Sequence, residues 1–176
     1  PVIMTELSGD WGVDLIVGAD GVNSLVRRSY EREFGATTRL LTNRFAWFGT
    51  SKPFETLTQT FIETERGFFN AHHYRYEPGL STFIVEVDQA SFERAGFAQM
   101  NDAKTRALCE RIFSKILDGH ALISNNSTWR QFPIVHNDRW RAHNTVLIGD
   151  ALHTAHFSIG SGTRLDLDRR TGDLVG

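Results

Sequence analysis

The sequence predicts an α/β fold in which two α/β segments near the ends of the chain flank an antiparallel-sheet insert. One observation is that an apolar run followed by a tight turn occurs twice, at residues 13–21 and 146–150. Another is that the runs between them are β-rich and are separated by turn residues. We therefore expect the first and last segments to form one domain and the insert to form another.

The first segment predicts a strand, a tight turn and a helix. Val13–Val17 reads VDLIV, a β-branched run typical of a strand that is buried on both faces of a parallel sheet. The turn GADG at residues 18–21 follows this strand. Asn23 or Ser24 can then cap a helix that starts LVRRSYEREF.

The insert predicts an antiparallel sheet with helices after it. Its β-rich runs are FAWFGT (45–50), LTQTFIET (57–64), FFNAHHYRY (68–76) and STFIVEVD (81–88). A short helix is expected over 90–96 and a longer one over 101–117, which Asn101 can cap. WRQFPIV (129–135) predicts a returning strand, and Val146–Ile148 predicts the next one. The aromatic side chains are expected to form the sheet core, and some of them to line a pocket: Trp47, Phe48, Phe68, Phe69, Tyr74 and Tyr76.

Composition excludes several classes of protein. The net charge of −2 argues against nucleic-acid binding, which needs a basic face. Cys109 is the only cysteine, so we expect no disulfide within the chain and a buried, unreactive thiol. No apolar run approaches the roughly 20 residues of a membrane span. We expect a cytoplasmic protein and, because the tail DLDRRTGDLVG lacks apolar periodicity, a fragment.

The turn after the first strand carries a candidate binding group. The carboxylate of Asp20 can accept hydrogen bonds from sugar hydroxyls, and Gly21 lets the backbone come close to a ligand. Arg27 can pair with Asp20 or reach a phosphate. The alternative is an ordinary strand-turn-helix with Ser24 as its cap and Arg27 on the surface.

The segment VLIGDALHTAHFSIGSG (146–162) raises three candidate ligands: a metal ion, a phosphate and a cofactor. Gly149-Asp150 places a carboxylate at the carboxyl end of a strand, where open α/β sheets bind ligands. Gly160 and Gly162 free the backbone to approach a flat or anionic group. Asp150, His153 and His156 could converge on a metal, but no H-E-x-x-H motif is present, and the sequence has neither a Walker loop nor a G-x-S-x-G elbow.

The two strand-end segments, taken together and in this order, resemble the D-G and G-D motifs of the group A flavoprotein monooxygenases. The segments are VDLIVGADGVNSLVRR and VLIGDALHTAHFSIGSG. These are aromatic hydroxylases of the para-hydroxybenzoate hydroxylase type. The second motif follows the pattern GDALxTxHFSIGxGT, which is more similar to the monooxygenase part of salicylyl-CoA and 2-aminobenzoyl-CoA hydroxylases. The resemblance extends over residues 13–165.

The resemblance implies a partial FAD-binding Rossmann-like domain, residues 1–40 and 136–176, interrupted by an antiparallel-sheet substrate domain, residues 41–135. It implies FAD as cofactor and NAD(P)H as co-substrate. Asp150 would hydrogen-bond the ribityl or pyrophosphate region of FAD, and the D-G positions would engage FAD and the nicotinamide cofactor. The cofactor-binding positions it implies are Asp20, Gly21, Arg27, Gly149, Asp150, Gly160 and Gly162.

The reaction implied is hydroxylation of a small aromatic substrate with O2 through a flavin hydroperoxide. An aryl-CoA such as salicylyl-CoA is a candidate substrate. No metal is implied, and no residue is assigned as catalytic, although four side chains are candidates to deprotonate a phenol or aniline: His72, Tyr74, His153 and His156.

The sequence also departs from the family pattern. His156 and Phe157 stand where the family has prolines, and Arg164 stands where it has asparagine. The G-x-G-x-x-G fingerprint that seats the ADP half of FAD is absent from this chain. We therefore expect a fragment that is inactive alone. The alternatives are a non-catalytic, truncated flavin-fold module and a metal-dependent hydrolase.

Overall fold

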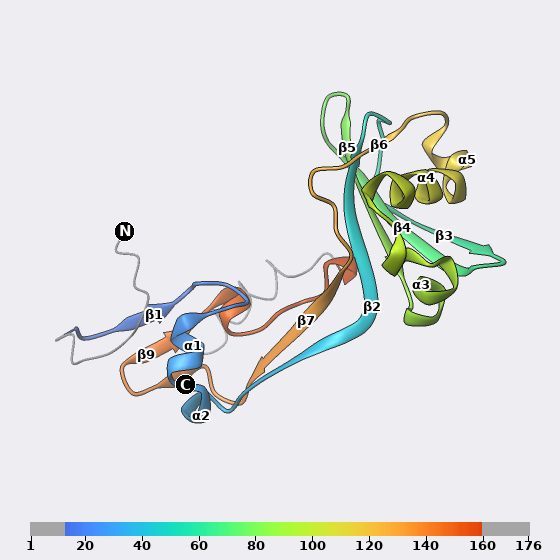
Figure 1. The fold of residues 1–176 in the computed structure, drawn as a ribbon. Helices are drawn as coiled ribbons and strands as arrows, with labels where there is room; N and C mark the ends of the chain where they lie inside the picture. The colour runs from blue at the N-terminus through green and yellow to red at the C-terminus, as the bar shows by residue number, and fades with distance from the viewer. Residues whose placement is uncertain (1–12, 160–176) are drawn as a thin grey trace. The chain divides into compact units, whose positions relative to one another are not determined.

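The computed structural model describes residues 13–159 of the chain (Figure 1). Its contacts divide the chain into two compact units: residues up to Leu40 together with those from Pro133 onward, and residues from Leu41 to Phe132. The predicted α/β class is confirmed, because the first unit combines helices with a parallel strand pair and the second contains an antiparallel sheet. The assignment of these units to FAD and to substrate stays a prediction.

The first unit holds a three-stranded sheet in the order β1-β9-β8. Strand β1 pairs in parallel with β9, with Ile16 opposite Thr145, and β8 pairs with β9 in antiparallel fashion. The elements are β1 (Ile16–Gly18), α1 (Leu25–Ser29), α2 (Glu31–Phe34), β8 (Arg141–Ala142), β9 (Thr145–Leu147) and the 3₁₀ turns η2 (Gly149–Ala151) and η3 (Phe157–Ile159).

The expectation that the first strand is buried on both faces is wrong. Leu15 is 58% exposed and Val17 is 49% exposed. The reason is that the apolar cluster of this unit, in which Val26 and Phe34 of the helices meet Leu147 of β9, covers one side of the described strands only. The strand is also shorter than predicted, because pairing with β9 begins at Ile16 rather than Val13.

The second unit is built on the larger sheet, in the order β3-β4-β5-β2-β6, and β7 also pairs with β2. The pairs β3–β4, β4–β5, β5–β2 and β2–β6 are antiparallel, as predicted. The strands of this sheet are β2 (Ala36–Thr50), β3 (Thr58–Thr64), β4 (Gly67–Glu77), β5 (Leu80–Val87), β6 (Leu122–Ile123) and β7 (Arg130–Asn137). Residues 36–40 of β2 and 133–137 of β7 are part of the first unit. The helices are α3 (Gln89–Ala95), the 3₁₀ turn η1 (Phe97–Gln99), α4 (Asp102–Ile112) and α5 (Ser114–Leu117).

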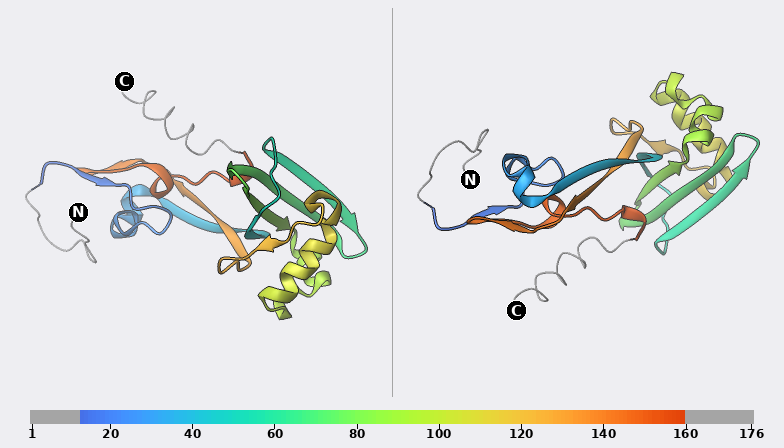
Figure 2. Two further views of the ribbon diagram at one scale, coloured as in Figure 1. Left: turned by 90° about the horizontal axis from the view of Figure 1, so that it is seen from above. Right: turned by 90° about the horizontal axis from the view of Figure 1, so that it is seen from below.

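Helices α3 and α4 lie on one face of this sheet (Figures 1 and 2). Because residues paired across antiparallel strands point to the same face, Phe48 and its partner Phe83 both join the core beneath the helices. The ring of Phe83 meets that of Phe113 edge-on at 5.4 Å. The alternate residues of the strands, Trp47 and Tyr74 among them, therefore lie on the opposite face, which no described helix of this unit covers in these views.

The predicted helix caps are confirmed. The Ser24 hydroxyl accepts a hydrogen bond from the backbone N–H of Arg27 at 2.9 Å, and the Asn101 side chain accepts one from Lys104 at 3.0 Å. Both long helices are shorter than predicted, because the backbone leaves helical geometry at Tyr30 and Phe113. Cys109 is buried in α4 as expected, and burial raises the pKa of its thiol to about 12. Nowhere in residues 13–159 does a helix have the length and apolar character needed to cross a membrane.

Candidate functional site

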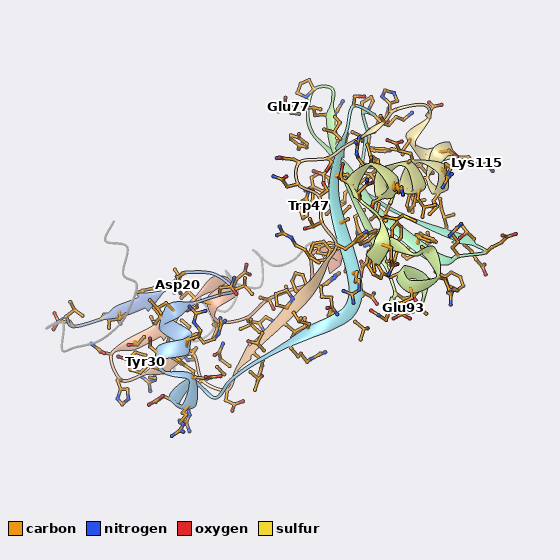
Figure 3. The ribbon with its side chains drawn as sticks, viewed as in Figure 1. Asp20, Tyr30, Trp47, Glu77, Glu93 and Lys115 are labelled. Carbon is orange, nitrogen blue, oxygen red and sulfur yellow. The ribbon has the colours of Figure 1, made fainter. Side chains whose placement is uncertain are left out.

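Asp20 lies just beyond strand β1, and its carboxylate caps helix α1 (Figure 3). The Oδ2 atom accepts hydrogen bonds from the backbone N–H groups of Leu25 at 2.6 Å and Val26 at 3.2 Å. Burial raises the pKa of this carboxyl, but hydrogen bonds from Ser24 and from the helix backbone lower it more, and the pKa lies below its usual 3.8. Asp20 is therefore an anion that the helix N-terminus holds in place.

The two glycines of this turn, Gly18 and Gly21, are favoured at their positions for different physical reasons. A Cβ atom on Gly18 would lie 2.7 Å from Leu147 Cδ2 and 2.9 Å from Val26 Cβ, so the strand, its neighbour and the helix meet too closely for a side chain. Gly21 has φ of +78°, which favours glycine, and nothing lies within 4 Å of where its Cβ would be. The open side at Gly21 leaves room for a ligand to approach the backbone.

Arg27 joins the two sequence motifs. Its side chain is 5% exposed, and Nη1 donates to the carbonyl oxygen of Ala151 at 2.8 Å. Nη2 donates to the carbonyl oxygen of Val22. Among the described residues Arg27 forms no ion pair with Asp20, so the predicted pairing and the alternative of a surface arginine are both wrong. Burial lowers the pKa of the guanidinium, and the charge of Asp20 raises it, with burial prevailing.

The second turn, which contains Gly149 and Asp150, is stabilised by backbone hydrogen bonds in which the carboxylate of Asp150 takes no part. Gly149 has φ of +61° and its carbonyl oxygen accepts hydrogen bonds from the N–H groups of Leu152 at 2.9 Å and His153 at 3.0 Å. The side-chain amide of Asn137 donates to the carbonyl oxygen of Leu152. Asp150 is exposed and makes no hydrogen bond or ion pair with any residue in the described range. Its carboxylate is free to accept hydrogen bonds from a ligand's hydroxyl groups.

The segment after this turn is anchored by a threonine that the sequence analysis did not single out. Thr154 is 4% exposed, accepts a hydrogen bond from the backbone N–H of Val135 at 2.8 Å and donates to the carbonyl oxygen of Pro133 at 2.8 Å. The T in GDALHT was the available signal, but only the fold shows what it contacts. Gly160 and Gly162 lie outside the described residues, and their binding role stays a prediction.

The histidines do not form a metal centre with Asp150. Within residues 13–159 no three His, Cys, Asp or Glu side chains lie close enough together to hold a metal ion. His156 instead contacts Ser158, whose hydroxyl lies 2.7 Å from the Nδ1 atom. The convergence of Asp150, His153 and His156, on which the metal alternative depends, is therefore not found.

The open face of the insert sheet carries a cavity of about 860 Å³. Aromatic side chains form much of its wall, as some were predicted to do, and Figure 3 shows Trp47 among them on β2. The aromatic side chains on this face are Phe45, Trp47, Tyr74 and Tyr76; Phe48 also borders the cavity, although its side chain belongs to the core on the other face. Of the remaining predicted aromatics, Phe69 belongs to the core at 1% exposure, whereas Phe68 is 61% exposed. A cavity of this size and character suits a flat organic ligand.

The same face holds a buried histidine–carboxylate pair. The Nε2 atom of His72 lies 3.3 Å from Glu86 Oε2 and 3.0 Å from Asn70 Nδ2, and Asn43 donates to Glu86 Oε1 at 3.0 Å. His72 and Glu86 are both at most 9% exposed. The neighbouring His73 points to the helix-covered face, where its ring stacks on that of Phe83 at 5.5 Å. Because successive residues of a strand point to opposite faces, the sequence alone places His72 and His73 on different faces of the sheet. Only the strand register shows that Glu86 lies beside His72.

The family model described as an FAD binding domain matches residues 11–165. Salicyloyl-CoA 5-hydroxylase of a Streptomyces species is 42% identical over 163 residues, which are 88% of this chain and 32% of that protein. The 3-hydroxy-4-methyl-anthranilyl-(aryl-carrier protein) 5-monooxygenase of Streptosporangium sibiricum is 43% identical over 155 residues, 88% of this chain and 40% of that protein. The chain thus spans about a third to two fifths of the length of these relatives.

Solved structures share the fold. The 2-methyl-3-hydroxypyridine-5-carboxylic acid oxygenase superposes with a TM-score of 0.63 at 17% identity, over 91% of this chain and 46% of that one. Aklavinone-11 hydroxylase, solved with FAD and aklavinone, superposes with a TM-score of 0.61 at 21% identity, over 88% of this chain and 29% of that one. The resemblance predicted from the two turns is confirmed, because the family model includes both of them. The chain belongs to the FAD binding domain family.

Proposed function

We propose that the protein carrying this chain is an FAD-dependent monooxygenase that hydroxylates an aromatic ring, with NAD(P)H and O2 as co-substrates. The observation that carries this proposal is that Arg27 joins the D-G turn to the G-D turn, so that one unit presents both flavin motifs. The relatives named above, a salicyloyl-CoA hydroxylase and an aryl-carrier monooxygenase, support an aromatic thioester as substrate.

The residues of the first unit fit FAD. The free carboxylate of Asp150 stands beside a glycine with positive φ, an arrangement suited to accepting hydrogen bonds from the ribityl hydroxyls. Gly21 has open space where a side chain would be, which permits a close approach of the cofactor to the backbone. Asp20 acts differently, because it is already bound to helix α1 and positions the turn. Gly160 and Gly162 complete the proposed set.

FAD supplies the redox chemistry of oxygen activation when it is bound, and the chain's own residues bind and orient. In the overall reaction an aromatic C–H, O2, NAD(P)H and a proton become an aromatic C–OH, water and NAD(P)⁺. The aromatic cavity of the insert would hold the substrate ring by stacking and would exclude water from it. The imidazole of His72, which pairs with Glu86 on the same sheet face, is a candidate acceptor for a substrate proton.

The test measures NAD(P)H oxidation and product mass with the protein that carries this chain, reconstituted with FAD. Salicyloyl-CoA is expected to stimulate NAD(P)H oxidation and to yield a product heavier by one oxygen atom, and salicylate to stimulate it less. If the folded protein stays colourless and FAD does not raise its melting temperature, it is a non-catalytic module instead. If FAD binds but no aromatic thioester gains oxygen, the proposed reaction is wrong.

A further inference from the structure

Two cavities of the insert lie against one loop, residues 124–128, which reads SNNST and is called the SNNST loop below. The first is the aromatic cavity of about 860 Å³ described above, and the second, of about 620 Å³, is bounded by Asp102 and Arg106 of α4. The residues that line both cavities are Ile123, Ser124, Asn126, Ser127 and Thr128. The SNNST loop is therefore a shared wall between an aromatic cavity and a polar one.

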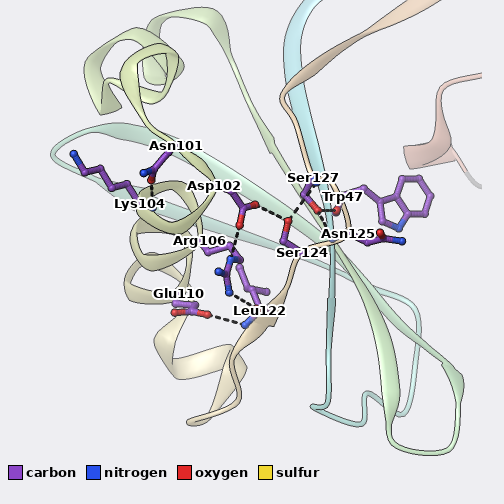
Figure 4. A network of polar contacts seen from close by, with 10 residues as sticks. All are labelled: Trp47, Asn101, Asp102, Lys104, Arg106, Glu110, Leu122, Ser124, Asn125 and Ser127. Atoms are coloured by element: carbon purple, nitrogen blue, oxygen red, sulfur yellow. Dashed lines mark hydrogen bonds and ion pairs between the residues drawn. The ribbon is translucent and has the colours of Figure 1, made fainter.

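The two serines hold this loop in place (Figure 4). Ser124 donates a hydrogen bond to Asp102, which also accepts one from Arg106 Nε at 2.9 Å. Ser127 donates to the carbonyl oxygen of Trp47 on β2. Because α4 fixes one end of the loop and β2 the other, the wall keeps its shape without a ligand, which lowers the entropy cost of binding.

The two asparagine side chains of the SNNST loop do not hold the loop in place. Asn125 and Asn126 are exposed, and neither side-chain amide makes a hydrogen bond with the residues that the structure describes. Asn125 lines the aromatic cavity alone, whereas Asn126 lines both. Each amide offers N–H donors and a carbonyl acceptor, which match the amide groups of a ligand.

The charges around the loop indicate what kind of ligand fits. Arg106 is neutralised by its ion pair with Asp102, and Arg130 is the other cation among the lining residues. A nucleotide with a 3′-phosphate and a diphosphate carries several negative charges, and its binding needs more basic residues than these two arginines. A neutral chain of amide groups, attached to an aromatic ring, suits this wall better.

We propose that the SNNST loop binds the pantetheine arm of an aryl thioester, with the ring in the aromatic cavity and the arm crossing the loop toward the polar cavity. This inference rests on the proposed function, from which it takes the aryl thioester. It goes further because it assigns recognition to the arm, which coenzyme A and an aryl-carrier protein share, and it names Asn125 and Asn126 as the residues that bind it.

The test compares the affinities of salicylate, salicyloyl-pantetheine and salicyloyl-CoA for the full chain by calorimetry. Salicyloyl-pantetheine is expected to bind at least about tenfold more tightly than salicylate and within about threefold of salicyloyl-CoA. Substituting Asn125→Ala together with Asn126→Gly should weaken salicyloyl-pantetheine about five- to tenfold and leave salicylate unchanged. Glycine is chosen at Asn126 because its φ is +55°.

Gln99→Ala is the matched control, because it removes an exposed side-chain amide of the same unit that lines neither cavity. To distinguish the sources of the arm, salicyloyl-CoA and a salicyloyl-carrier protein are each displaced with salicyloyl-pantetheine, and displacement is expected for both. Equal affinities for salicylate and salicyloyl-pantetheine, or an unchanged double variant, would overturn the proposal. FAD-induced change in the melting temperature, measured on the same samples, tests the proposed function separately.

Discussion

The molecule contains two strand-end turns with a Gly and an Asp, and they use the aspartate in opposite ways. Asp20 accepts two backbone hydrogen bonds from helix α1 and so belongs to the folded structure. Asp150 makes none with the described residues, because the backbone and side-chain amides around it bond to carbonyl oxygens instead. Similar sequences at the ends of paired strands thus give one structural carboxylate and one that is available to a ligand.

The largest expected effect comes from breaking the connection between the two turns. Arg27→Ala leaves the carbonyl oxygens of Ala151 and Val22 without their donor and removes a buried side chain, so we expect the free energy of unfolding to fall by about 3 kcal/mol. Urea unfolding measures this loss. Arg28→Ala is the control, because Arg28 is exposed and should change stability by less than about 0.5 kcal/mol. Equal effects of the two substitutions would show that Arg27 does not join the turns.

The glycines of the two turns should differ next. Gly18→Ala places a methyl group against Leu147 and Val26, and we expect it to cost about 2 kcal/mol by overpacking. Gly149→Ala meets the positive φ of +61° instead and should cost about 1 kcal/mol. Thermal unfolding of both variants checks the order. A larger loss for Gly149→Ala would mean that crowding at Gly18 is relieved by small side-chain shifts.

Sequence reasoning predicted local features of these turns and missed the long-range ones. Ser24 was recognised as a cap because capping depends on residues within one helical turn. The partner of Arg27, however, lies 124 residues away, and no local pattern encodes such a contact. The same reason explains strand β2, which was predicted from residue 45 but begins at Ala36. Strand β2 also pairs with β7, which lies far along the chain, and the local hydropathy pattern does not encode such a pairing.

The two carboxylates themselves can be separated by amide substitution. Asp20→Asn weakens the cap of helix α1, and we expect a loss of about 1 kcal/mol in the free energy of unfolding. Asp150→Asn should change stability by less than about 0.5 kcal/mol, because its carboxylate makes no hydrogen bond or ion pair with residues 13–159. If Asp150 binds FAD as proposed, the same substitution weakens FAD binding about tenfold in a titration followed by flavin fluorescence. If Asp150→Asn lost stability but kept its affinity for FAD, the role given to Asp150 would be wrong.

The smallest effect is the pH dependence that Asp20 gives to stability. Because the folded chain lowers the pKa of this carboxyl below 3.8, the unfolded chain binds more protons in acid. The contribution of Asp20 is therefore fully present above the unfolded pKa and is lost as the pH falls through the lower, folded pKa. Asp20→Asn should remove this part of the acid slope in urea unfolding between about pH 5 and 3. Ser24→Ala should only reduce it, since the backbone hydrogen bonds of Leu25 and Val26 remain. An unchanged slope in Asp20→Asn would show that the helix N-terminus does not hold Asp20 as an anion, and the contrast with Asp150 would then lose its electrostatic basis.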